Sequence, residues 1–99
     1  MSVDKFREAC KSGDISEVER YIREGGDPSA NSNYAIRWAS ANGHIDVVRL
    51  LLSDKRVDPS ADNNIAIRCA SEHGHTEVVK LLLSDRRVDP SDDNNVAIR

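Results

Sequence analysis

The sequence predicts an all-α solenoid of stacked helix-turn-helix units, and three observations support this prediction. A 31-residue segment occurs twice in succession, at residues 33–63 and 64–94, with 22 of its 31 positions identical. Each copy holds two short stretches with apolar residues at helical spacing. A glycine, Gly43 or Gly74, separates the two stretches. One such unit cannot bury its apolar side alone, so successive units are expected to stack around a shared core.

All 99 residues are expected to form one repeat domain. Residues 1–32 are a looser first unit, rich in charged side chains, and are predicted to act as an N-terminal cap. Residues 33–63 and 64–94 are the second and third units, and residues 95–99 repeat the start of a fourth.

Each complete unit is predicted to contain two helices and a loop. The first helix is expected at residues 35–42 and 66–73, and the second at residues 44–54 and 75–85. The second helix is apolar over more than half of its circumference, which indicates neighbours on two sides. An Asp-Pro-Ser sequence then ends each unit, because proline cannot continue a helix and aspartate and serine supply turn hydrogen bonds.

Composition excludes several classes of protein. The net charge of -3, with both signs mixed along the chain, argues against a nucleic-acid partner. No apolar run approaches the ~20 residues of a membrane span, and the N-terminus has no apolar signal core, so neither a membrane partner nor secretion is indicated. Cys10 and Cys69 are expected to be free thiols in a reducing compartment, cytoplasmic or nuclear.

Two stretches carry a family resemblance, "AIRWASANGHIDVVRLLL" at residues 35–52 and "AIRCASEHGHTEVVKLLL" at residues 66–83. Their Gly-His pair, followed by two valines, a basic residue and three leucines, resembles the ankyrin repeat. The resemblance implies a protein-binding solenoid whose first helices line a concave groove. It also implies that the imidazoles of His44 and His75 bond loop backbone between repeats. The period is 31 rather than the ~33 usual for ankyrin, so the loops that project between units should be short.

Residues that differ between units indicate where a partner would bind, because scaffold residues repeat and binding surfaces diverge. Four of the nine differences between the second and third units fall on the first helix, and the first unit contributes the matching positions. Trp38, Ala41 and Asn42 share one helix face, and an exposed Trp38 would be a good binding anchor, although packing between repeats is an equal alternative. The predicted protein-binding residues are Glu8, Lys11, Ser12, Tyr34, Trp38, Ala41, Asn42, Cys69, Glu72 and His73.

Catalytic, metal and cofactor sites are not expected. Cys69 and His73 lie four residues apart on one helix, but nothing in the chain supplies an orienting group or an oxyanion site. The three histidines lack the four-ligand spacing of structural zinc. Arg37, Arg68 and Arg99 recur at the 31-residue period and could form an anion-binding stripe. We interpret them instead as a structural ladder, in which each arginine pairs with loop carboxylates such as Asp58 and Asp89 or with loop carbonyls.

The sequence therefore predicts a non-enzymatic protein-protein interaction module that binds an unidentified protein through its first-helix face. The alternative is a structural or self-associating segment: a spacer, a fragment of a longer array or an engineered scaffold. Weak self-association would then use the face around Val78, Val79, Leu82 and Leu83.

Overall fold

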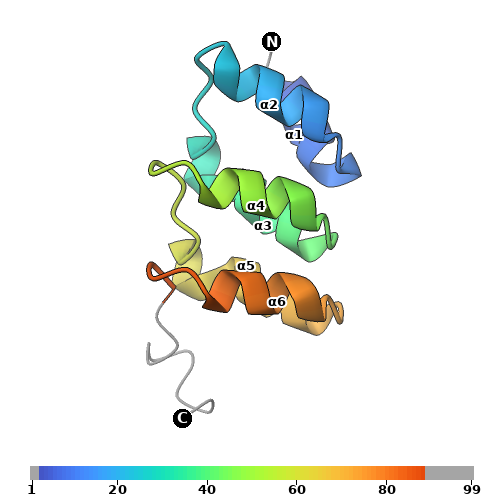
Figure 1. The fold of residues 1–99 in the computed structure, drawn as a ribbon, viewed down its shortest axis with the longest axis vertical. Coiled ribbons are helices and arrows are strands. Elements are labelled where there is room, and N and C mark those ends of the chain that lie inside the picture. The colour runs from blue at the N-terminus through green and yellow to red at the C-terminus, as the bar shows by residue number, and fades with distance from the viewer. Residues whose placement is uncertain (1–2, 89–99) are drawn as a thin grey trace.

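The computed structural model describes residues 3–88, and this part of the chain is helical with no strand. The six helices are connected in pairs, and each pair forms one layer of the stack in Figure 1. The all-α solenoid is confirmed, whereas residues 95–99, the predicted start of a fourth unit, lie outside the described residues. The helices are α1 (Val3–Ser12), α2 (Ile15–Arg23), α3 (Ala30–Ala41), α4 (Ile45–Leu52), α5 (Ala61–Glu72) and α6 (Thr76–Leu83).

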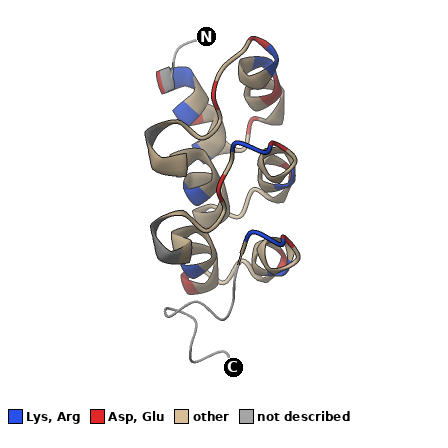
Figure 2. Ribbon diagram, turned by 90° about the vertical axis from the view of Figure 1, so that its left-hand side faces the viewer, with Lys and Arg blue, Asp and Glu red and all other residues tan. Residues whose placement is uncertain are grey.

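The first helices of the three pairs form one column and the second helices form the other (Figure 2). In the first column, α3 packs against both α1 and α5. In the second column, α4 packs against both α2 and α6. One core runs through all three pairs, and the rings of Phe6 and Tyr21 stack in its first layer with centroids 3.9 Å apart.

The first helices begin earlier than the sequence predicts. The apolar spacing predicts starts at residues 35 and 66, but α3 and α5 begin at Ala30 and Ala61. The extra turn contains Asn33 and Asn64, whose φ angles of +59° and +61° lie in the left-handed region that asparagine tolerates. This turn departs from regular helix geometry, so no apolar periodicity marks it.

The Asp-Pro-Ser loops make the turn hydrogen bonds that the sequence predicts. The carboxylate of Asp58 accepts hydrogen bonds from the backbone N–H of Ser60 at 2.9 Å and from its hydroxyl at 2.6 Å. Asp27 and Ser29 make the same two contacts in the preceding loop. Asn33 Oδ1 accepts a hydrogen bond from the Asp58 N–H at 2.8 Å, which ties α3 to the loop that follows α4.

Among the described residues, Arg37 makes no ion pair with Asp58, so the loop-carboxylate form of the predicted ladder is not seen at this position. The Asp58 carboxylate is engaged by Ser60, and Arg37 lies beside the ring of Trp38. Arg56 and Arg87 join successive units through hydrogen bonds. They lie in the loops, where their partners are backbone carbonyls of the preceding unit.

Arg87 makes the more extensive of these two contacts. Its guanidinium donates to the carbonyl oxygen of Leu52 at 2.7 Å and to that of Val57, and it pairs with Asp85 at 2.8 Å. The Arg87 side chain also holds the pKa of Asp85 below its ordinary value. A cation at the end of α4 complements the helix dipole, so this contact stabilises the junction between two units.

We expect Arg87→Ala to lower the free energy of unfolding by about 2 kcal/mol, because charge-assisted hydrogen bonds to half-buried carbonyls would be lost. The adjacent Arg86 is exposed and provides the control. Arg86→Ala should change stability by less than about 0.5 kcal/mol. Urea denaturation followed by circular dichroism measures both, and equal effects of the two substitutions would contradict the assigned role.

The face predicted for self-association is largely internal. Val78 and Leu82 are 2% and 0% exposed, so they belong to the core of the third unit. Leu83 is 42% exposed, and Val79 is half-buried. Within residues 3–88, no helix has the length and apolar character needed to cross a membrane.

Candidate functional site

Four of the predicted binding residues surround one hollow between α3 and α5. Trp38 and Ala41 line it from α3, Cys69 lines it from α5, and His73 lines it from the position directly after α5. Arg37 and Ile65 complete the lining, and the hollow has a volume of about 330 Å³. We call it the α3–α5 hollow, and we call the surface formed by α1, α3 and α5 the first-helix face. Four residues at positions that differ between units thus meet at one place.

Positive charge lies directly over the indole of Trp38. The Lys11 Nζ atom is 4.7 Å from the ring centroid, and the Arg37 guanidinium carbon is 6.0 Å from it. Both distances fall within the range in which a cation is attracted to an aromatic face. Lys11 comes from the neighbouring unit, so this contact joins α1 to α3 and holds a half-buried indole at the edge of the hollow.

Tyr34 is placed differently from the other predicted binding residues. It is 4% exposed, and the Arg7 guanidinium lies over its ring at 5.0 Å. Its hydroxyl is buried and has no hydrogen-bond partner among the described residues, and burial raises its pKa to about 12. Tyr34 therefore packs within the stack, beneath the first-helix face, and is not presented to solvent.

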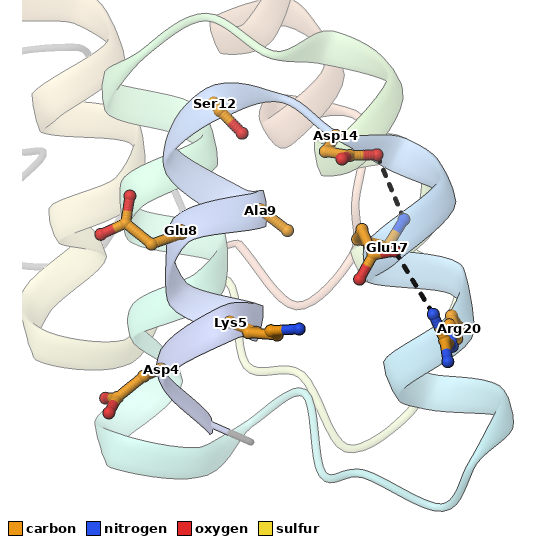
Figure 3. Close-up of a pocket in the computed structure, with 8 residues that line it drawn as sticks. All are labelled: Asp4, Lys5, Glu8, Ala9, Ser12, Asp14, Glu17 and Arg20. Atoms are coloured by element: carbon orange, nitrogen blue, oxygen red, sulfur yellow. Dashed lines mark hydrogen bonds and ion pairs between the residues drawn. The ribbon is translucent and has the colours of Figure 1, made fainter. Parts of the chain in front are cut away.

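Glu8 and Ser12 line a second, more polar hollow between α1 and α2 (Figure 3). In Figure 3 the Glu8 side chain points away from α2, whereas Lys5 points toward it. On the α2 side, Asp14 caps the helix by accepting the Glu17 N–H at 3.3 Å, and Glu17 pairs with Arg20 at 3.7 Å. The two carboxylates that line the hollow from the α2 side, Asp14 and Glu17, are therefore engaged by α2 itself.

The two remaining predicted residues, Asn42 and Glu72, are exposed near the C-terminal ends of α3 and α5. The Asn42 side-chain amide donates to the carbonyl oxygen of Trp38 at 3.0 Å. This bond fixes Asn42 against its own helix end, while Glu72 extends the first-helix face on α5.

The Cys69 and His73 pair does not have the geometry of a nucleophile and its base. His73 Nδ1 lies 2.8 Å from the backbone carbonyl oxygen of Cys69, so this ring nitrogen is engaged by the main chain. Both cysteines are free, and burial raises the pKa of the Cys10 thiol to about 12. Among residues 3–88, no group of three or more histidine, cysteine, aspartate or glutamate side chains could hold a metal ion.

His44 has the structural role that the family resemblance implies. Its Nε2 atom lies 2.6 Å from the carbonyl oxygen of Lys11, and a carbonyl can only accept, so Nε2 carries the proton. The ring packs against Gly13, and the ring of His75 packs against Gly43 in the same way. These contacts fix the spacing of successive first helices, and so the width of the α3–α5 hollow.

Sequence reasoning missed Arg37 and Ile65 as lining residues and Arg7 as a residue of the first-helix face. The position of Arg37 is also an arginine in the third unit, so a comparison that selects differences between units does not select it. Ile65 occupies the position of Tyr34 in the next unit, but Tyr34 is buried whereas Ile65 is half-buried, so the two residues do not share a role. Arg37 directly precedes Trp38 in the sequence, and this adjacency is the only sequence signal for it.

Comparison with known protein families gives one match. A family model described as ankyrin repeats (3 copies) matches residues 6–94, which confirms the predicted resemblance. Neither the comparison with curated proteins nor that with solved structures found a match. Ankyrin repeats are generally protein-interaction modules and are typically non-enzymatic.

Proposed function

Because the chain belongs to the ankyrin-repeat family, we propose that it is a non-enzymatic module that binds a protein partner through the first-helix face. The observation that carries this proposal is the α3–α5 hollow, which brings together Trp38, Ala41, Cys69 and His73. A half-buried tryptophan at the edge of an apolar hollow has the character of a binding hot spot.

The contrast between repeated residues and variable residues within each unit supports the same proposal. The Gly-His pairs and the Asp-Pro-Ser turns are repeated and make internal contacts. The residues that vary, such as Trp38 and Cys69, line the hollow. A scaffold that repeats while one surface varies is suited to recognition, because the surface can change without loss of the stack.

The experiment compares two triple variants as baits in affinity capture. The first, Trp38→Ala/Glu72→Ala/His73→Ala, removes side chains at and beside the hollow. The second, Glu19→Ala/Arg49→Ala/Lys80→Ala, removes exposed side chains from the second helices and serves as the matched control. We expect a partner to be retained by the parent and the control, and to bind the first variant at least tenfold more weakly.

Both variants must show the parental circular dichroism spectrum before they are compared. Equal loss of the partner from both baits would indicate that the second helices also bind. Retention of the partner by the hollow variant would remove the first-helix face from consideration.

Self-association through the last described unit is the alternative function. It is favoured by the exposure of Leu83 and by the open space beside Gly74, where no described atom lies within 4 Å of an added Cβ. The first unit of a second copy, however, has Asp14 where the later units have a histidine, so it would not supply the ring that packs on Gly13 and Gly43. Sedimentation velocity decides this point, since a mass that rises with concentration and falls in Leu83→Ser would support the alternative.

A further inference from the structure

The α3–α5 hollow combines an apolar lining with a cationic edge. Trp38, Ala41, Ile65 and Cys69 line it and are all half-buried. Its volume of about 330 Å³ is at the lower end for binding pockets in proteins and is suited to one large side chain rather than a cofactor. The hollow itself therefore selects an apolar group.

The cationic edge lies on the α1 and α3 side. Lys11 and Arg37 are both within 6.0 Å of the Trp38 ring centroid, and among residues 3–88 neither makes an ion pair with a carboxylate. By contrast, Arg49 and Lys80 on the second helices each pair with an acid on their own helix. Figure 2 shows cationic residues on all three first helices.

The charge around the hollow is of limited extent. Glu8 on α1 and Glu72 on α5 are exposed on the two helices that flank α3. The chain as a whole carries a net charge of -3. A long polyanion such as a nucleic acid would meet this negative charge. A short segment with a few carboxylates would instead reach Lys11 and Arg37 alone.

We propose that the α3–α5 hollow binds a short acidic peptide segment of a partner protein, in which one bulky apolar side chain enters the hollow. Carboxylates that flank this side chain lie against Lys11 and Arg37. This inference rests on the proposed function and adds the chemistry of the partner to it. Charge complementarity at the edge sets orientation and on-rate, and burial of the apolar side chain against Trp38 supplies most of the affinity.

The test uses a library of random heptapeptides displayed on phage and selected against the immobilised chain. We expect the selected peptides to contain one large apolar residue flanked by at least two acidic residues. The most enriched sequence is then synthesised and titrated into the protein. Trp38 is the only tryptophan of the chain, so its fluorescence reports on the hollow directly.

Two charge variants make the titration specific. Lys11→Gln/Arg37→Gln should bind the selected peptide about three- to tenfold more weakly and should lose most of the salt dependence. Arg49→Gln/Lys80→Gln makes the same change in net charge on the second helices and should leave the affinity unchanged.

Each other outcome overturns the inference. If the selected peptides lack acidic residues but need Trp38, the partner chemistry is wrong and the proposed function stands. If no peptide is enriched, or if binding is insensitive to Trp38→Ala, the acidic-peptide inference and the proposed function both fail. If single-stranded oligothymidine displaces the peptide at comparable concentration, the cationic edge binds anions without regard to their source.

Discussion

Leu51→Ala is expected to lower the free energy of unfolding by about 3 kcal/mol, because the substitution leaves a cavity in the middle of the stack. Leu51 is 0% exposed and lies on α4, which packs against α2 on one side and α6 on the other. The lost side chain therefore weakens both junctions of the second unit. Urea denaturation followed at 222 nm measures the change.

Leu83→Ala is the matched control for this substitution. Leu83 is the same residue type on the equivalent second helix, but it is 42% exposed. Leu83→Ala should lower the free energy of unfolding by less than about 1 kcal/mol, because the Leu83 side chain already exposes much of its apolar surface to water. Similar losses for the two variants would mean that α4 is not the centre of a continuous core.

The helix pairs could be predicted because their signals are local. Gly43 and Gly74 break the apolar pattern between helices, and the apolar faces of α4 and α6 require neighbours on both sides. The starts of α3 and α5 could not be predicted. The turn before each apolar stretch contains Asn33 or Asn64 in a left-handed conformation, and in sequence these asparagines are typical of a loop.

The candidate site could be predicted in part. The comparison of repeats identified Trp38 and Cys69, which line the same hollow, because variable positions at one register must lie on one face of a stack. It also selected Tyr34, which is buried. The guanidinium of Arg7 lies over Tyr34, but Arg7 is 27 positions away in the looser first unit, so the 31-residue period does not connect the two residues.

The contacts of the loop arginines could not be predicted for a related reason. Arg56 and Arg87 bind carbonyl oxygens of the preceding unit, and every residue has a carbonyl. Sequence patterns reveal partners that are recognisable by residue type, such as an acidic side chain that can pair with a basic one. They do not reveal which backbone groups are left without a partner at a helix end.

Gly13→Ala is expected to lower the free energy of unfolding by about 3 kcal/mol, through two effects that can be separated. Gly13 has a φ of +83°, where an alanine is strained by about 1 kcal/mol. A Cβ at this position would also lie 2.6 Å from His44 Nδ1. The ring would have to move, and its hydrogen bond to the Lys11 carbonyl would be lost at a further cost of about 2 kcal/mol.

Gly74→Ala isolates the first of these effects. Gly74 has a φ of +76°, but no described atom lies within 4 Å of an added Cβ, so only the backbone strain of about 1 kcal/mol is expected. The double variant Gly13→Ala/His44→Ala tests the second effect. Once the ring is absent, the added methyl group meets no obstacle, and the two substitutions should cost less together than the sum of their separate effects.

Additive losses in this cycle, or equal losses for Gly13→Ala and Gly74→Ala, would show that the His44 ring does not hold the first two units in register. If the losses are non-additive as expected, the His44 contact contributes to the junction between α1 and α3, beside the contacts of Arg7 with Tyr34 and of Lys11 with Trp38. The same junction places Lys11 over Trp38, so Gly13→Ala should also shift the fluorescence of Trp38 in the folded protein. Gly74→Ala, at the other end of the stack, should leave that signal unchanged.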